Sequence, residues 1–505
     1  MRLVSSLFSV LVSATSGISA APAAEPRPNI LLVLIDDMGW PDLACYGHGF
    51  HETPRLDRLA TEGVRFTNFY ATPVCSSTRA TIESGQNSAR VGITDFLAGH
   101  WKPFAKLVVP PMPSHLDQNL TTPGEALGRA GYVTGYFGKW HLGRGKQNAP
   151  AVHGYQITRD RLDRAFRLAR TGDNEGPKRM GLITDQALWF LERHAGLPRD
   201  SAGERKPFFL HVSHHAVHIP IQATARSIAK YRKKPKPAVG VNHPVYAAMV
   251  EDLDTQIGRL LDRLEDLQLA RKTVVVVASD NGGLREVYTG NGQVVSTNAP
   301  LRSEKGTIYE GGIRVPFIVR WPGVTPPGKV CHEPAATWDL LPTFCTIAGA
   351  PGPEQPLDGV DLTPLLRVPS STLERDALYF HYPHYHHSRP ASAIRRGNLK
   401  LIEWLEDGAL ELYDLAADTG ESRDLAASMP AKAKELRRDL VAWRQRIGAR
   451  LPTRNPKHDP EKADVWWSRR TSTPLDLEAV GDRLERTASK PYFRTSSSAG
   501  RGRRE

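Results

Sequence analysis

A single cysteine stands four residues before an arginine in residues 73–85. The serines and threonine between Cys75 and Arg79 are residue types found at helix N-termini. The unpaired N–H groups and the dipole of a helix N-terminus attract anions there. Arg79 adds a permanent positive charge on a planar group that suits oxyanions. The pair therefore indicates a nucleophile beside an anion site, or simply a packed thiol at a helix start.

Polar side chains that suit a hard cation follow two strand-like runs. Residues 29–35 are apolar without alternation, which fits a strand buried on both faces of a parallel sheet. That run ends at Asp36 and Asp37, and a run of four valines ends at Asp280 and Asn281. Adjacent buried carboxylates repel each other and need a positive partner. We interpret these residues as ligands of a divalent cation; helix-capping acids are the alternative for the first pair.

Lys139 and His141 follow a third strand-like run, residues 132–137. The two side chains alternate, so an extended backbone would point them to the same side. Flanking glycines permit close approach of the backbone. This pattern favours a functional role for Lys139 and His141, although a lone lysine and a lone histidine are usually surface residues.

Three histidines, His214, His215 and His218, follow a fourth run, residues 208–213. Their number suggests zinc, but their spacing lacks a regular zinc-ligand pattern. The prediction is therefore that His218 acts at the site and that no zinc binds here.

The runs that carry these residues alternate with helical segments. We expect helices at 54–62, 123–130, 159–168, 183–194 and 244–267, and a further strand at 64–70. Such alternation predicts an α/β fold with a mostly parallel sheet. Ligands in such sheets bind outside the carboxyl ends of the strands. The four polar groups should therefore meet on one rim with Cys75 and Arg79, where an oxygen-only ligand set favours calcium or magnesium over zinc.

Six motifs, in the family's order, resemble those of the type I, formylglycine-dependent sulfatases, arylsulfatase-like members of the alkaline phosphatase superfamily. They are residues 29–39, Cys75-x-x-x-Arg79 with Thr81 and Gly85, residues 138–143, residues 218–220, residues 301–316 with Lys305, and residues 412–425. Ser77 stands where the usual cysteine motif has proline. The resemblance implies an alkaline-phosphatase-like sandwich, with a large mixed, mostly parallel sheet between helices and a smaller C-terminal antiparallel-sheet subdomain.

The resemblance also implies a metal and a modified residue. A formylglycine-generating enzyme would convert Cys75 to formylglycine (3-oxoalanine), whose aldehyde hydrate is the nucleophile. One calcium ion per chain would be held by Asp36, Asp37, Asp280, Asn281 and an oxygen of residue 75.

The remaining roles follow from the same resemblance. Calcium, Lys139 and Lys305 would neutralise the sulfate oxygens, and His218 would protonate the departing alcohol. His141 would help to release sulfate from the hydrate, and Arg79 would hold the hydrate and orient the loop. Glu310 and Arg314 are expected to brace the loop instead of touching substrate.

The chain divides by composition into four parts. Residues 1–23 read as a signal peptide, with Arg2, a short apolar run too brief to span a bilayer, and a small-residue cleavage site. We expect a catalytic domain at 24–370, an antiparallel C-terminal subdomain with a helix (430–447) at 371–448, and an extended or disordered basic tail at 449–505. Within the subdomain, strands are predicted at 393–404 and 410–415. The protein should be exported to the periplasm or beyond the cell, with no stable membrane insertion.

The composition limits the partners. The 505 residues carry 66 lysines and arginines against 54 acids, a formal charge of +12 that suits an anionic substrate. Nucleic acid is not expected, because no basic face with interleaved aromatics is evident. Of the four cysteines, Cys331 and Cys345 could pair, or all four could be free.

The expected reaction is hydrolysis of sulfate monoesters, with sulfated carbohydrates as the expected substrates. The alternatives are a phosphonate or phosphate ester hydrolase of the same superfamily, and an inactive sulfate-ester binding protein in which Ser77 prevents oxidation of Cys75. Five residues are candidates for contacts at the rim of the site, with a solvated loop as the alternative: Tyr382, His384, His386, His387 and Arg389.

Overall fold

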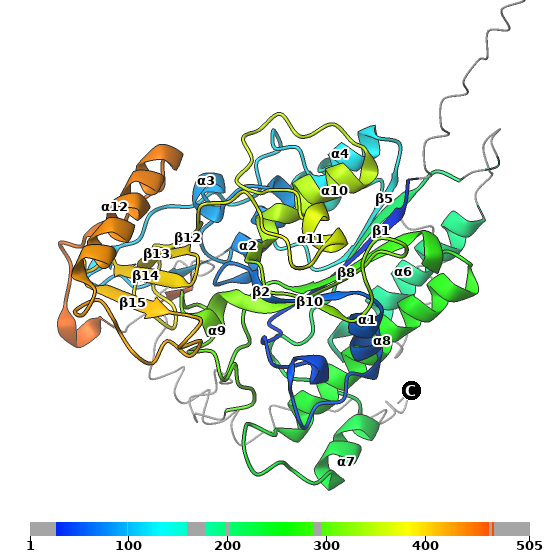
Figure 1. The fold of residues 1–505 in the computed structure, drawn as a ribbon, viewed down its shortest axis with the longest axis horizontal. Coiled ribbons are helices and arrows are strands. Elements are labelled where there is room, and N and C mark those ends of the chain that lie inside the picture. The colour runs from blue at the N-terminus through cyan, green and yellow to red at the C-terminus, as the bar shows by residue number, and fades with distance from the viewer. Residues whose placement is uncertain are drawn as a thin grey trace, which may run out of the picture.

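The computed structural model describes residues 27–97, 99–158, 177–196, 203, 205–285, 294–463 and 467–468. A mixed nine-stranded sheet forms its centre, in the order β10-β2-β9-β8-β1-β7-β5-β6 with β11 also beside β2 (Figure 1). Its strands are β1 (Asn29–Ile35), β2 (Val64–Tyr70), β5 (Val133–Gly138), β6 (Ile157–Thr158), β7 (Phe208–Ser213), β8 (Thr273–Ser279), β9 (Arg314–Arg320), β10 (Lys329–Cys331) and β11 (Ala335–Ala336). Strand β9 runs antiparallel to β2 and β8, and the other pairs are parallel. The expected mostly parallel α/β sheet is therefore present.

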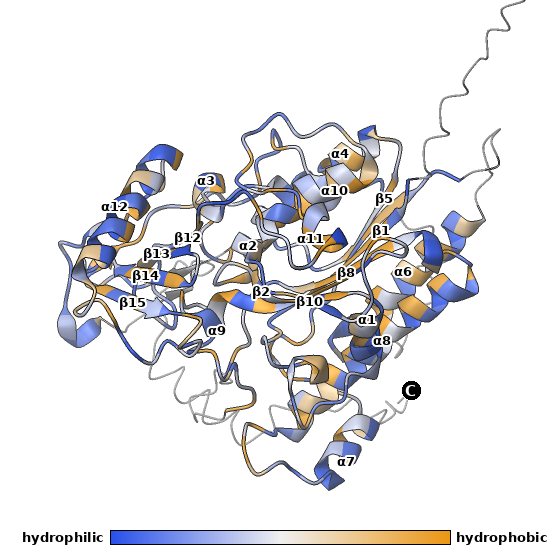
Figure 2. Ribbon diagram, viewed as in Figure 1, coloured by the Kyte–Doolittle hydropathy of each residue, from blue (hydrophilic) through white to orange (hydrophobic). Residues whose placement is uncertain are grey.

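Helices cover both faces of this sheet, which explains why β1 is apolar at every position after Asn29. Leu31, Val33 and Ile35 of β1 pack in one core, and its other apolar residues pack in the second core on the opposite face. The first core includes α1 (Pro54–Glu62), α6 (Met180–Ala195), α7 (Ala225–Lys233) and α8 (Pro244–Asp266). The second includes α2 (Cys75–Ser84), α4 (Pro123–Arg129), α10 (Leu340–Ala348) and α11 (Thr363–Arg367). Figure 2 shows the resulting contrast between apolar strands and two-sided helices.

A smaller antiparallel sheet adjoins the large one. It contains β12 (Leu378–Tyr382), β13 (Ala391–Arg396), β14 (Leu399–Trp404) and β15 (Leu410–Asp414), in that order. Helix α12 (Pro430–Ile447) packs on one face together with α3 (Ser88–Val91). The other face packs against residues of the large domain, including Tyr70 and Trp338, close to α9 (Glu310–Ile313).

One prediction about the chain needs correction. Residues 393–404 are not one strand, because Gly397 adopts φ 56° and turns the chain between β13 and β14. Of the two alternatives for the cysteines, the structure has all four free, so Cys331 and Cys345 do not pair. In the described part of the tail, β16 (Thr453–Arg454) pairs with β4 (Leu107–Val108), and β17 (Trp467–Ser468) pairs with β3 (His100–Trp101).

Two further predictions fall on undescribed parts of the chain. The signal peptide at 1–23 and the helix expected at 159–168 lie outside the described residues. Among the helices that the structure describes, none has both the length and the apolar composition that crossing a bilayer requires.

Candidate active site

The polar residues that follow β1, β5, β7 and β8 meet at one edge of the large sheet. These four strands are neighbours and parallel, so their carboxyl ends lie side by side. The Asp37 N–H donates to Asp280 Oδ1 over 3.1 Å, and Asn281 Nδ2 donates to Asp37 Oδ1 over 2.8 Å. The exits of β1 and β8 thus form one continuous acidic surface, as the sequence predicted.

Cys75 joins this edge from the start of α2. Its side chain is 2% exposed, and Sγ lies 3.1 Å from His141 Nδ1. Ligand atoms of Cys75, Asp36 and Asp280 all lie within 4.8 Å of one another. The helix cap is Val74 and not a hydroxyl residue; the Ser77 hydroxyl instead donates back to the Val74 carbonyl over 2.8 Å. The thiol is therefore placed between a histidine and two carboxylates, and burial raises its pKa.

Arg79 ties α2 to three strand ends, one helical turn after Cys75. Its Nε and Nη2 donate to Asp280 Oδ2 over 3.0 and 2.6 Å, and Nη1 donates to the Lys139 carbonyl and the Ser213 hydroxyl. The guanidinium is 2% exposed. Arg79 therefore fixes the loop that carries Cys75 against β5, β7 and β8.

Two lysines neutralise the paired aspartates. Lys139 Nζ lies 2.6 Å from Asp36 Oδ2, and Lys305 Nζ lies 2.7 Å from Asp37 Oδ1. Burial alone would raise the pKa of both carboxyls, but Lys139 beside Asp36 and Lys305 beside Asp37 hold each pKa below its usual value. Both aspartates are thus anionic in a site that is almost closed to solvent.

The donor set fits a hard divalent cation. Asn281 Oδ1 is buried without a hydrogen-bond partner in the structure, although Nδ2 of the same amide is engaged. A buried acceptor left unpaired is costly. Asp37 accepts from the same amide, and burial together with the Asp36 charge raises the pKa of the neighbouring Asp280 to about 7 despite Arg79. A cation bound among these oxygens would satisfy the amide and relieve the crowding of like charges, and oxygen-only sets suit calcium or magnesium.

The two candidate proton carriers differ in exposure. His141 is largely buried, and burial with the Lys139 charge lowers its pKa to about 2, so its imidazole is neutral. His218 is 31% exposed; its Nδ1 donates to the Ile219 carbonyl over 2.6 Å, which leaves Nε2 3.7 Å from Asp37 Oδ2. Burial and Lys305 lower the pKa of His218 to about 4. Nε2 of His218 is therefore the nitrogen that can exchange a proton at the mouth of the site.

The histidine trio does not form a metal site. His214 is fully buried, and neither of its ring nitrogens has a hydrogen-bond partner in the structure. Among the described residues, the groups whose ligand atoms converge include His218 with Asp36 and Asp37, but neither His214 nor His215. Of the three histidines, His218 is therefore the one that the structure brings to the paired aspartates.

One lysine near the site escaped the sequence analysis. Lys178 Nζ donates to the Ile219 carbonyl over 2.8 Å, beside the loop that carries His218. Burial lowers its pKa to about 8, while the charges of Asp36 and Asp37 oppose that shift. Lys178 belongs to an irregular, arginine-rich stretch without a recognisable motif, so nothing in the local sequence singled it out.

The residues proposed for the rim divide into two groups. Tyr382 and His384 are 1% exposed, and bond to Asp95 and Thr94, so they do not line an open rim. His387 Nδ1 donates to the Lys305 carbonyl over 2.6 Å and so supports the loop that carries Lys305. The other two candidates, His386 and Arg389, are partly exposed near this loop, His386 against Gly306 and Arg389 paired with Asp407.

Glu310 and Arg314 brace the structure, as expected. Glu310 is fully buried and accepts from the Tyr70 hydroxyl and from Lys400 Nζ of the small sheet. Arg314 Nη1 lies 3.5 Å from Glu310 Oε2. The two residues join the large sheet to the small one without reaching the acidic edge.

Comparison with known proteins identifies the family. A family profile described as Sulfatase matches residues 28–350, more than half of the chain. The chain belongs to the sulfatase family. A second profile, described as N-sulphoglucosamine sulphohydrolase, C-terminal, matches residues 303–446, which include the small sheet and α12. The chain is accordingly a sulfuric ester hydrolase.

Relatives of this sulfatase match along most of their length. A protein named Sulfatase from Formosa agariphila is 31% identical, over 86% of this chain and 92% of its own. Human arylsulfatase A is also 31% identical, over 83% of this chain and 87% of its own. Among solved structures, Ps i-CgsB in complex with k-i-k-neocarrahexaose superposes with a TM-score of 0.67 at 24% identity, over 92% of this chain and 98% of that one. This last likeness supports the alkaline-phosphatase-like fold.

Proposed function

We propose that this sulfatase hydrolyses sulfate monoesters of carbohydrates, using formylglycine made from Cys75 and one bound calcium ion. The observation that carries the proposal is the position of Cys75, 3.1 Å from His141 and within the same 4.8 Å cluster as Asp36 and Asp280. A carbohydrate substrate is supported by the C-terminal family profile, whose description names a sulfated amino sugar hydrolase. The formal charge of +12 suits such anionic substrates.

The chain's own residues would hold both groups. Calcium would bind Asp36, Asp37, Asp280, Asn281 and an oxygen on residue 75, and would supply Lewis-acid polarisation of the sulfate ester. The hydrated aldehyde of residue 75 would supply the nucleophilic oxygen. Arg79 donates to Asp280 from the first turns of α2, so it holds a proposed calcium ligand and the helix that carries residue 75 in fixed positions.

Four other side chains complete the proposed chemistry. Lys139 and Lys305 bring two positive charges to the place where sulfate oxygens gain negative charge. His218 would protonate the departing alcohol through Nε2, since its Nδ1 is held by the Ile219 carbonyl, and the negative charge of the bound sulfate would favour the imidazolium form that this step requires. His141, neutral and 3.1 Å from the side chain of residue 75, accepts the proton whose removal releases sulfate.

The same proposal covers maturation and location. A formylglycine-generating enzyme is the expected partner during maturation, and residues 1–23 would direct export to the periplasm or beyond the cell. The proposed domains are 24–370 and 371–448, followed by the tail at 449–505.

The test compares the parent with Cys75→Ala on aryl sulfates and on a panel of sulfated mono- and polysaccharides. We expect turnover by the parent and none by Cys75→Ala, and an intact mass about 18 Da below that of the thiol form for the Cys75 peptide. Equal turnover by both proteins would refute the nucleophile. Faster turnover of phosphate or phosphonate esters would favour the alternative hydrolase.

A thiol mass without turnover would favour the inactive binding protein. In that case Ser77→Pro is the informative variant, because proline is tolerated in the first turn of a helix and Ser77 is the third residue of α2. If the Cys75 peptide of Ser77→Pro shows the decrease in mass, Ser77 is the reason that Cys75 is not converted in the parent.

A further inference from the structure

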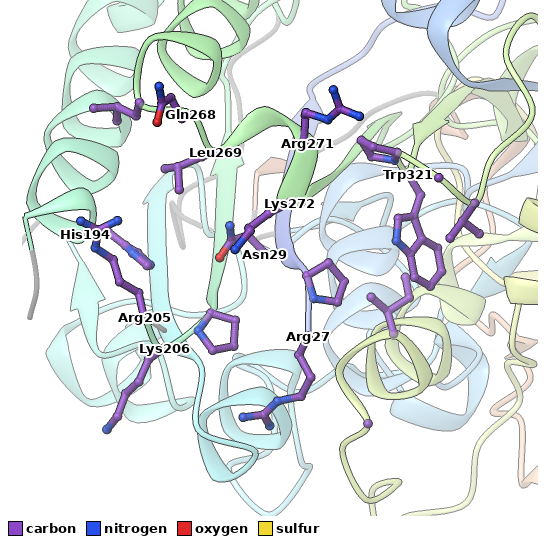
Figure 3. Close-up of a pocket in the computed structure, with 18 of the residues that line it drawn as sticks. Arg27, Asn29, His194, Arg205, Lys206, Gln268, Leu269, Arg271, Lys272 and Trp321 are labelled. Carbon is purple, nitrogen blue, oxygen red and sulfur yellow. The ribbon is translucent and has the colours of Figure 1, made fainter. Parts of the chain in front are cut away.

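A large basic pocket lies at the end of the sheet opposite to the candidate active site. Its volume is about 940 Å³, and it is lined by the residues that precede three central strands, including Asn29 of β1, Pro207 before β7 and Lys272 before β8 (Figure 3). Asp36 and Asp280 follow the other ends of the same strands. Seven residues of extended chain span roughly 20 Å, so the pocket and the acidic edge are separate sites.

The lining of this pocket is strongly and uniformly cationic. No described residue that lines it is an aspartate or glutamate. Burial lowers the pKa of His194 in the lining to about 4, so this residue is neutral at pH 7. The permanent charges come from six side chains: Arg27, Arg205, Lys206, Arg271, Lys272 and Arg367. Six cations around one cavity create a positive potential that attracts a polyanion.

The shape and the aromatic wall of the pocket indicate what kind of anion fits. Trp321 forms one wall, facing the cavity across from His194 (Figure 3). The Arg367 guanidinium lies 5.6 Å from the Trp321 ring centroid and adds a charge beside that apolar surface. The volume is in the range of sites for extended organic ligands and far exceeds that of a single inorganic anion. A flat aromatic wall among spread charges suits sugar rings that carry several sulfates.

We propose that this pocket binds a sulfated stretch of the polysaccharide substrate, at a distance from the bond that is cleaved. The inference rests on the proposed function for the class of ligand, but the binding itself needs no catalysis. A polymer held here would keep its other sulfate esters at a high local concentration near the active site. The pocket would therefore increase the activity on polymeric substrates and would not change the activity on small esters.

The test measures binding of a heparin dodecasaccharide to the Cys75→Ala protein by isothermal titration calorimetry. The pocket variant is Lys206→Gln/Arg271→Gln/Arg367→Gln, and the control is Arg226→Gln/Arg232→Gln/Lys233→Gln on α7. All six residues are exposed, both triples remove three charges, and the control residues do not line the pocket. We expect the pocket variant to bind about tenfold more weakly, because it removes three of the six permanent charges that line the cavity. The control should bind like the parent.

Four results would overturn the proposal. Equal weakening by both triples would mean a general charge effect, and no weakening by the pocket triple would mean that the glycan binds elsewhere. Tighter binding of polyphosphate than of the dodecasaccharide at the same ionic strength would assign the pocket to phosphate polymers. A fully desulfated dodecasaccharide should not bind measurably, and equal binding would also contradict the proposal.

A kinetic measurement on mature protein gives an independent check. The pocket triple should raise KM for a sulfated polysaccharide several-fold and leave kcat/KM for an aryl sulfate unchanged. Loss of both activities would indicate damage to the fold, which thermal unfolding of the same samples detects. If the proposed function failed, aryl sulfate turnover would be absent in the parent while the calorimetric comparison would still decide whether the pocket binds sulfated glycan.

Discussion

Lys400 provides a sharp test of how the two sheets are joined. It lies on β14 with no exposure, and its Nζ is 2.9 Å from Glu310 Oε1 and 2.8 Å from Glu421 Oε1. Burial alone would raise the pKa of Glu310, but Lys400 and Arg314 lower it to about 2. Lys400→Met keeps the length of the side chain and removes the charge, which leaves two buried carboxylates beside each other.

The expected cost follows from that burial. Removing one partner of a fully buried ion pair costs about 3–5 kcal/mol, because the other charge stays buried without compensation. Domains are stabilised by only about 5–15 kcal/mol in total. The matched control is Lys432→Met, since the Lys432 side chain is 38% exposed and pairs with Glu435 of α12. The control should cost less than about 1 kcal/mol.

The assay is urea unfolding followed by tryptophan fluorescence, because Trp404 on the same strand is buried. A loss of less than about 1 kcal/mol in Lys400→Met, equal to that of the control, would refute the reasoning. The pH dependence gives a second check. In the parent, Glu310 has a lowered pKa and stabilises the fold above about pH 4.5, and this contribution is lost as the pH falls towards 2. In Lys400→Met the buried carboxyls acquire raised pKa values, so stability is highest at low pH and the deficit should grow from pH 5 to pH 8.

Three further predictions concern the active site. His218→Gln should lower kcat about 100-fold for an alkyl sulfate but less than about tenfold for nitrophenyl sulfate, whose leaving group needs no proton; equal losses would contradict the acid role. Calcium at 100 times its Kd should stabilise the parent by about 2.7 kcal/mol in thermal unfolding, and Asn281→Leu should lose most of that gain; an undiminished gain would exclude Asn281 as a ligand. Gly138→Ala should destabilise by about 1–3 kcal/mol, because φ is +108° and a Cβ would lie 1.8 Å from the Ser213 carbonyl oxygen. Gly352→Ala, with no neighbour within 4 Å, is the control, and similar losses in both would argue against strain at Gly138.

The parts of the fold that the sequence predicts best are those with one dominant signal. Mainly apolar runs located β1 and β7 to the residue, since both strands are buried at every position. Strand β2 was located by Gly63 before it and by the Cys75 loop after it. Helix α12 was located equally well by Pro430 at its start and Gly448 after its end. The convergence of the acidic residues followed from the rule that parallel strands end at one edge. Their pairing with particular lysines did not, because it depends on side-chain directions in three dimensions.

The failures have a common physical cause. The turn at Gly397 was missed because charged and apolar residues continue on both sides of it, as in one strand. Lys178 was missed, and Tyr382 was misplaced, because long-range packing decides their surroundings. The pairing of β16 was not predicted for the same reason, since its partner β4 lies more than 300 residues earlier. These contacts join residues that are far apart in the chain, so the local sequence does not predict them.

The burial of Cys75 bears on the order in which the chain would fold and be modified. Every residue of α2 is buried, and the thiol sits beneath the loops that end β5 and β7. If Cys75 is converted to formylglycine as we propose, the modifying enzyme would need to reach this thiol before α2 docks. Folding and conversion would then compete in time, and a chain that folded before conversion would be well packed but would lack the proposed nucleophile.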